Sequence, residues 1–226
     1  MSNQVLVTSN ASGAVTGGQL GHVVVIVDVI SMSTTLEAVL DVGALAVYGA
    51  SPDICRAPVA LDPYKIGMLA GERALAEGTG EVVIVSEPRI GTDAERLARA
   101  QKTIKGVEAA GAKVGAVLPN LGAETAKMID FTNQVVVAVT DTGGVAYDAA
   151  WQAGAPAVVV GTVARTLRQR GLEPARTAAA RACAEAQRLK TGITVVAASA
   201  NSLEDILAAE FIAKEIIGQG FTQLKG

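Results

Sequence analysis

The sequence predicts an α/β protein, a layered α/β/α arrangement around a largely parallel sheet, built from two duplicated halves. Short β-branched runs alternate along the chain with Ala-rich helical stretches, as in βαβ units. The strand candidates are continuously apolar, as at Val23–Val27 and Val135–Val139, which indicates strands covered on both faces. Similar segments also recur at a nearly constant spacing, which favours an internal duplication.

Each element is predicted from its local pattern. The expected strands are the β-branched runs Gln4–Thr8, Val23–Asp28, Leu45–Gly49, Glu81–Val85, Lys113–Leu118, Gln134–Thr140, Ala157–Gly161 and Ile193–Ala197. The expected helices are the stretches Thr34–Val42, Pro63–Glu77, Asp93–Ala110, Glu124–Asp130, Val145–Ala153, Val163–Gly171, Pro174–Lys190 and Leu203–Gly218. Gly13–Gly21 is expected to be a loop, and it lacks the spacing of a nucleotide-binding glycine motif.

The repeat rests on two matches. Val24–Val47 aligns with Val135–Val158, each running from a strand through a polar loop and a helix to a Gly-Ala pair. Thr79-Gly80 and Thr191-Gly192, each before a strand, match at nearly the same offset along the chain. Similar offsets in the same order favour duplication over chance, with halves of about 22–112 and 134–226. We expect the halves to interleave in one sheet and to form a single domain over residues 1–226.

Composition narrows the function classes. The 226 residues carry a formal net charge of −3, so no strong positive field attracts nucleic acid or an anionic membrane. The N-terminus does not resemble a signal peptide, and the apolar runs are too short to cross a bilayer. Cys55 and Cys183 have no CxxC spacing and are expected to be ordinary thiols in a reducing compartment. We expect a cytoplasmic protein with no nucleic-acid or membrane partner, and a homodimer is compatible with the sequence.

The first candidate site is the loop Asp28–Thr35, which follows a buried strand. In open α/β sheets ligands bind beyond the carboxyl ends of the strands. Asp28 could hold Mg²⁺ through its carboxylate, while hydroxyls and helix N–H groups bind phosphate oxygens. The hydroxyls belong to Ser31, Ser33, Thr34 and Thr35. Thr34 with Glu37 three residues later also has the spacing of a helix capping box, and capping does not exclude ligand binding by the other hydroxyls.

Three further loops qualify by the same rule. Thr140–Gly144 offers the Asp141 carboxylate and an anion-binding or simply turn-forming stretch at Thr142, Gly143 and Gly144. Ser199–Asp205 is expected to cap a helix through Ser202 and Asp205, which leaves Glu204 to face a metal or water. In Ser86–Asp93, Arg89 either clamps a phosphate or sulfonate or is simply solvated.

Other conspicuous residues favour structural roles. His22 is the only histidine and precedes a strand, which argues against a His base and a multi-His metal site. Tyr147 and Trp151 lie one helical turn apart and indicate core or interface packing. The arginines on the Ala-rich helices indicate a solvated face, with an acidic partner as the alternative. They are Arg165, Arg168, Arg170, Arg176, Arg181 and Arg188.

Several loops together resemble the 2-phosphosulfolactate phosphatase family. Asp28-Val-Ile-Ser-Met-Ser-Thr-Thr35 is similar to the family's Asp-Val-Leu-Arg-Ala-Ser-Thr-Thr motif. Ser202-Leu-Glu-Asp205 resembles its Ser/Ala-Leu-Glu-Asp helix start, and Asn120–Thr125 weakly resembles its Leu-Gly-Asn-Ser-Pro segment. Ser31 stands where the family has Arg, and Asp141–Val145 stands where it has Thr-Asn-Gly-Thr-Arg.

The resemblance implies an α/β, Mg²⁺-dependent phosphatase acting on a small phosphorylated acid such as 2-phosphosulfolactate. By this resemblance Asp28, Glu204 and Asp205 are catalytic, and Asp28, Glu204 and Asp141 hold Mg²⁺. Losing two arginines weakens phosphate binding, since each charged hydrogen bond contributes about 1.5–3 kcal/mol. A non-catalytic small-molecule-binding or regulatory protein with this fold is the alternative, and a structural subunit of a larger assembly is a third.

Overall fold

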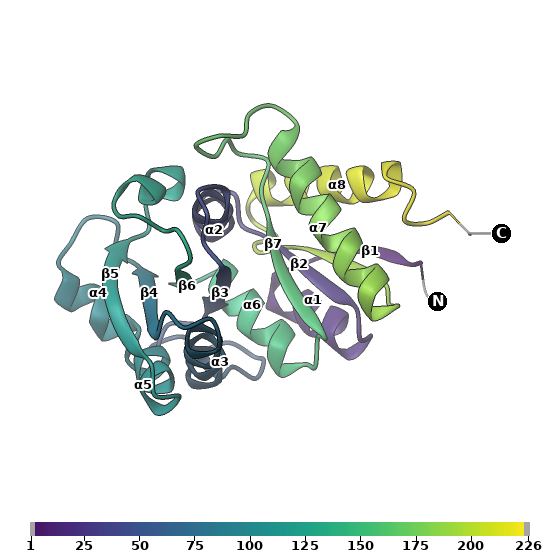
Figure 1. The fold of residues 1–226 in the computed structure, drawn as a ribbon. Helices are drawn as coiled ribbons and strands as arrows, with labels where there is room; N and C mark the ends of the chain where they lie inside the picture. Colours follow the sequence, from purple (N-terminus) through teal and green to yellow (C-terminus); the bar gives the residue numbers. More distant parts are fainter. Residues whose placement is uncertain (1–2, 224–226) are drawn as a thin grey trace.

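The computed structural model describes residues 3–223 and contains two four-stranded parallel sheets flanked by helices (Figure 1). The strands are β1 (Val5–Ser9), β2 (Val23–Val27), β3 (Ala46–Ala50), β4 (Glu81–Ser86), β5 (Lys113–Pro119), β6 (Val135–Val139), β7 (Ala157–Gly161) and β8 (Ile193–Ala197). The helices are α1 (Asn10–Gln19), α2 (Met32–Asp41), α3 (Pro63–Ala76), α4 (Asp93–Arg99), α5 (Gln101–Ala109), α6 (Gly143–Gln152), α7 (Glu173–Leu189) and α8 (Leu203–Gly218), with a 3₁₀ helix η1 at Gly122–Lys127. The predicted α/β class with parallel, helix-covered strands is confirmed.

The two sheets interleave the predicted halves. The first sheet has the order β1-β8-β2-β7 and the second has the order β5-β4-β6-β3. Strand β2 therefore lies between two strands of the C-terminal half, and β6 lies between two strands of the N-terminal half. The expectation of one shared sheet was wrong, because the strands divide into two sheets. Duplication itself stays a prediction, and residues 224–226 of the predicted second half lie outside the described residues.

Strand β2 shows why its sequence is continuously apolar. Val23, Val25 and Val27 pack against α7 and α8, whereas Val24 and Ile26 belong to the core shared with α2, α6 and the second sheet. All five side chains of β2 are fully buried. Burying each contributes about 1.5–3 kcal/mol, so strands covered on both faces are apolar at every position.

The expected Gly-rich loop at Gly13–Gly21 was wrong, because most of it lies in α1. A Cβ atom at Gly17 would lie 2.9 Å from Cβ of Thr194, and one at Gly18 would lie 2.7 Å from Cβ of Ala153. The glycines thus let α1 approach β8 and α6 closely. Tertiary packing overrides their weak helix propensity.

The expected helix at Val163–Gly171 was also wrong, because this stretch is an irregular loop after β7. The Asp41 carboxylate at the end of α2 accepts hydrogen bonds from Thr166 Oγ1 and the Arg168 backbone N–H, both at 2.7 Å, and from the Gln169 side chain at 3.3 Å. These bonds supply polar partners that a helix would have found within itself.

Two other helix predictions need correction. The expected single helix at Asp93–Ala110 is broken at Ala100, whose φ of −114° and ψ of 13° end α4 and precede α5. The stretch expected as a helix at Glu124–Asp130 is the short 3₁₀ helix η1 instead. No helix within residues 3–223 is both long enough and apolar enough to span a membrane.

Candidate functional site

The carboxyl ends of strands from both sheets meet around the loop that follows β2. Asp28 bonds residues that follow β6, Ser31 bonds residues that follow β4 and β5, and Val29 bonds the first turn of α8. This convergence follows from parallel strands, whose carboxyl ends share one edge of a sheet. Segments far apart in the sequence therefore share one polar cluster.

Asp28 joins the two sheets at this cluster. Its side chain is buried, and Oδ2 accepts hydrogen bonds from Thr142 Oγ1 and the Gly143 backbone N–H, each at 2.9 Å. The carboxylate thus accepts hydrogen bonds at the N-terminus of α6, where the helix dipole favours a negative charge. Burial raises the pKa of Asp28, while the bonds from Thr142, Gly143 and the Met32 N–H, and the charge of Arg89, oppose that rise.

Asp205 is the second carboxylate of the cluster. Its Oδ1 accepts a hydrogen bond of 2.8 Å from the backbone N–H of Val29, and it is only 4% exposed. Burial and the negative charge of Asp28 raise the pKa of Asp205 to about 6. Ser202 Oγ accepts from the Asp205 N–H at 3.2 Å, so the predicted helix cap at Ser202 is confirmed.

The other two acids expected to hold Mg²⁺ lie apart from this pair. The exposed Glu204 accepts a bond from Ser202 Oγ at 3.2 Å. Asp141 is 57% exposed at its side chain and pairs with Arg99 at 2.6 Å. Within residues 3–223, no group of three His, Cys, Asp or Glu side chains is arranged to hold a metal ion.

Asp28 and Asp205 are the two buried carboxylates of the cluster, and carboxylate oxygens are ligands of the type that Mg²⁺ prefers. Both carboxylates are desolvated, and their mutual repulsion raises the pKa of Asp205. Mg²⁺ is commonly held by one or two carboxylates together with waters and substrate oxygens. The Mg²⁺ requirement stays a prediction.

The hydroxyls expected to bind phosphate are bonded within the protein. Ser33 Oγ donates to Ile26 O at 2.9 Å and accepts from the Asp28 N–H at 3.0 Å. Thr34 Oγ1 donates to Val29 O at 2.6 Å. The remaining bonds run from Thr35 Oγ1 to Asn120 Oδ1, from Ser31 Oγ to Glu87 Oε1, and from Asn120 Nδ2 to Ser31 Oγ.

The expected capping box at Thr34 and Glu37 was wrong. Helix α2 begins at Met32, so Thr34 lies inside it. Glu37 is buried and pairs through both carboxylate oxygens with Arg181 of α7, at 2.6 and 3.1 Å. The spacing of Thr34 and Glu37 matches the capping-box motif, but Glu37 forms an ion pair with Arg181, which is distant in the sequence, instead of capping α2.

The glycines after β6 form the start of α6 rather than a free turn. The Gly144 N–H donates to Thr140 Oγ1 at 2.8 Å, as the Gly143 N–H donates to Asp28. A Cβ at Gly143 would overlap Asp28 Oδ2, so close approach of the carboxylate requires this glycine. Both N–H groups are therefore occupied by side chains of the protein.

Charged side chains lie along the rim of the cluster. Arg89 is exposed, donates weakly to Ile30 O at 3.5 Å, and opposes the rise in the pKa of Asp28. Arg99 lies 2.6 Å from Asp141 and 4.0 Å from Glu87. Burial and the charge of Asp141 raise the pKa of Glu87.

Sequence reasoning missed Glu87, Arg99 and the bonds of Asn120 and Thr162. Glu87, Asn120 and Thr162 each follow a strand directly, so the strand-end rule could have found them. Thr162 Oγ1 lies 2.8 Å from Thr34 Oγ1. Arg99 comes from the last turn of α4, where the sequence carries no signal for it.

No protein-family model, curated protein or solved structure matches this chain. The class of site is therefore described from the fold and the residues of the cluster alone. It is an acidic, hydroxyl-rich cluster with arginines at its rim, at the carboxyl ends of parallel strands.

Proposed function

We propose that the chain is a Mg²⁺-dependent phosphomonoester hydrolase acting on a small phosphorylated acid. One observation supports it most, namely two buried carboxylates in one cluster, Asp28 directly after β2 and Asp205 in the first turn of α8, where the charge of Asp28 raises the pKa of Asp205. Arg89 lies close enough to Asp28 to influence its pKa, so a cation is present for an anionic substrate.

The side chains have distinct roles in this proposal. Asp28 and Asp205 would hold Mg²⁺, which neutralises phosphoryl charge and lowers the pKa of a bound water. Arg89 orients the substrate's acid group through its planar fork. Bound Mg²⁺ would keep both carboxylates ionised, because its positive charge favours the carboxylate form.

The test is a phosphatase assay on a panel of small phosphorylated acids, with Mg²⁺ and with EDTA. We expect turnover that EDTA abolishes and that Asp205→Asn lowers by about 100-fold or more, since one such group typically contributes that much. The matched control is Glu204→Gln, at the neighbouring exposed position, which should retain activity. Turnover unaffected by EDTA or by Asp205→Asn would contradict the proposal.

A non-catalytic binding protein is the second candidate. The observation that favours it is that Oδ2 of Asp28, the Gly143 N–H and the hydroxyl of Ser33 already have partners inside the protein. Thermal stabilisation by one of the same acids without any turnover would favour this candidate.

A further inference from the structure

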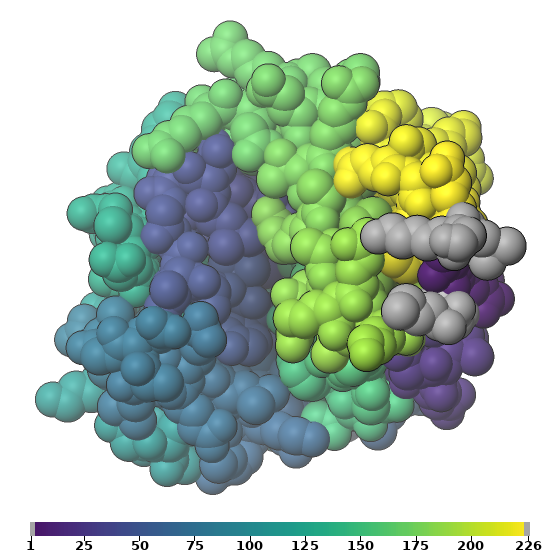
Figure 2. Space-filling view, turned by 45° about the vertical axis from the view of Figure 1, so that its right-hand side comes forward, coloured from purple at the N-terminus to yellow at the C-terminus, as the bar shows by residue number. Residues whose placement is uncertain are grey.

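A cavity of about 410 Å³ lies between the two sheets, away from the carboxylate pair. Its sides are β3 and β7, the edge strands of the second and first sheets. Helices α2, α6 and α7 contribute the rest of the lining, and Figure 2 shows the surface hollowed between the segments near residues 40–50 and 157–190. The volume falls within the range of small-molecule sites, about 300–1,000 Å³.

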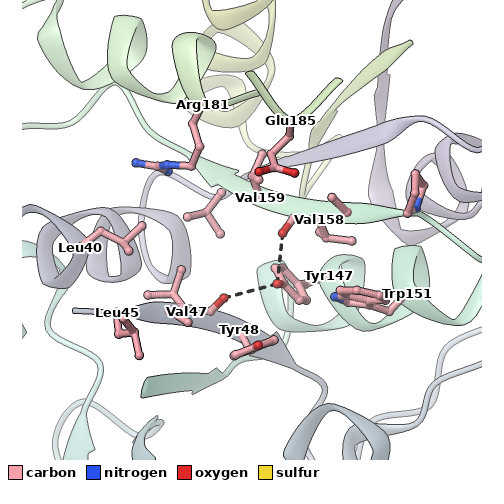
Figure 3. Close-up of a pocket in the computed structure, with 14 residues that line it drawn as sticks. Leu40, Leu45, Val47, Tyr48, Tyr147, Trp151, Val158, Val159, Arg181 and Glu185 are labelled. Carbon is pink, nitrogen blue, oxygen red and sulfur yellow. Dashed lines mark hydrogen bonds between the residues drawn. The ribbon is translucent and has the colours of Figure 1, made fainter. Parts of the chain in front are cut away.

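Aromatic side chains are concentrated in this cavity. The chain has one Trp and three Tyr, and Trp151, Tyr147 and Tyr48 all line the cavity (Figure 3). The single O–H of Tyr147 is shared between Val158 O of β7 at 3.2 Å and Val47 O of β3 at 3.4 Å, so Tyr147 lies between both edge strands. The expectation of core packing is confirmed for Tyr147, which is 1% exposed. Together with Leu40, Leu45 and the valines, the rings form an apolar wall.

Opposite charges lie one helical turn apart on the α7 side of the cavity. Arg181 and Glu185 both line it, yet each is paired elsewhere. Arg181 uses NH1 and NH2 for the buried Glu37, and Glu185 uses only Oε2 for Arg188, at 2.7 and 3.1 Å. In the described part of the chain, Glu185 Oε1 and Arg181 Nε have no hydrogen-bond partner. Their side chains remain 32% and 29% exposed.

We propose that this cavity binds a free amino acid with a large apolar side chain. The ligand's ammonium group bonds Glu185 Oε1, its carboxylate bonds the Nε–H group of Arg181, and its side chain packs against the partly exposed rings of Tyr48 and Trp151. Figure 3 shows the Glu185 carboxylate directed toward Val158 and Val159, on the opposite side of the cavity from the aromatic rings. The adjacent opposite charges of a zwitterion match adjacent opposite charges on one helix face.

A neutral apolar ligand fits these observations less well. It would displace water from Glu185 and Arg181 without replacing their hydrogen bonds, and buried polar groups without partners are destabilising. A ligand bearing one charge would satisfy one of the two groups only. Both charges and the apolar side chain are therefore needed.

The experiment uses Trp151, the only Trp of the chain, as the reporter. L-Leucine does not fluoresce, so a saturable change in Trp emission reports its binding, and calorimetry provides a second readout. The comparison ligands are 3-methylbutylamine, which lacks the carboxylate, 4-methylpentanoate, which lacks the ammonium group, and glycine, which lacks the side chain. We expect each to bind at least about tenfold more weakly than L-leucine.

A variant tests the assignment of the ammonium end of the ligand. Glu185→Gln should weaken L-leucine binding by about tenfold, while 4-methylpentanoate should bind no more weakly than before, because the variant removes a negative charge near this anion. Arg176→Gln is the matched control, since Arg176 lies on the same helix and pairs with Glu215 instead. The proposal is overturned if L-leucine gives no saturable signal by either method. It is equally overturned if 3-methylbutylamine or 4-methylpentanoate binds as tightly as L-leucine, or if Glu185→Gln binds L-leucine like the unaltered protein.

Discussion

Two buried carboxylates at corresponding positions of the predicted halves are satisfied in different ways. Glu37 and Asp148 are matched when Val24–Val47 is aligned with Val135–Val158. Glu37 pairs with Arg181, whereas Asp148 accepts hydrogen bonds from Ser51 Oγ at 2.6 Å and from the Asp62 backbone N–H at 2.9 Å. Burial raises the pKa of Asp148 above its ordinary value of 3.8, because these neutral donors compensate only part of the lost hydration.

Asp148 should therefore make folding pH-dependent. Because its folded pKa is raised, the folded state binds the proton more tightly than the unfolded state. Its contribution to stability is full below the ordinary value of 3.8 and declines as the pH rises toward the folded pKa. Urea unfolding measured from about pH 4 to pH 7 should show a shallower decline in Asp148→Asn than in the parent. Glu108→Gln, an exposed change on α5, should keep the parent's slope, and an equal slope in Asp148→Asn would contradict the assignment.

The positions of the site residues were predictable to different degrees. Asp28 and Asp205 follow or cap elements recognisable in the sequence, so the strand-end rule located their loops. That the two loops would join one cluster was not predictable, because they lie far apart in the chain and strand order decides which loops adjoin. The hydrogen-bond partners of Ser33 and Thr34 were likewise not predictable. The sequence around a hydroxyl does not indicate whether that hydroxyl binds a ligand or a backbone carbonyl.

At the scale of elements, α3 and α5 approach each other through paired glycines. A Cβ at Gly67 would overlap the Thr103 backbone oxygen, and one at Gly106 would overlap the Tyr64 backbone oxygen. Real Cβ atoms do not approach backbone that closely, so a larger residue would push the helices apart.

Gly67→Ala should lower the free energy of unfolding by about 1–3 kcal/mol, through overpacking at this crossing. Gly218→Ala is the matched control, because Gly218 lies at the end of α8 with open space around it. The control should be neutral or stabilising by up to about 0.5–1 kcal/mol, the usual helix preference for Ala over Gly. Urea unfolding measures both variants, and a Gly67→Ala protein as stable as Gly218→Ala would exclude the close crossing.

At the scale of the whole molecule, each sheet depends on both predicted halves. Val23 of β2 lies opposite Ile193 and Ala157, while Val135 of β6 lies opposite Val82 and Ala46. Neither half can keep its central strand paired if the other half unfolds. We therefore expect the two sheets to unfold together.

Native-state hydrogen exchange tests this expectation. Amides of β2 and β6 should exchange at the same free energy of opening, equal to that of global unfolding, because both are central strands buried on both sides. Edge strands β1 and β5 should exchange faster. A β6 that opens at a clearly lower free energy than β2 would show instead that the sheets unfold separately.

The sequence by itself determined the α/β class and the approximate position of every strand. Hydrophobic burial acts on each strand locally, so a strand covered on both faces must be apolar throughout, as at Val23–Val27. Only the tertiary structure decided that the strands form two sheets, that Val163–Gly171 is a loop, that Asp28 bonds the start of α6, and that Asp205 bonds the neighbouring Val29. The physical reason is that these outcomes depend on partners distant in the chain, whose hydrogen bonds and charges leave no periodic pattern in the local sequence.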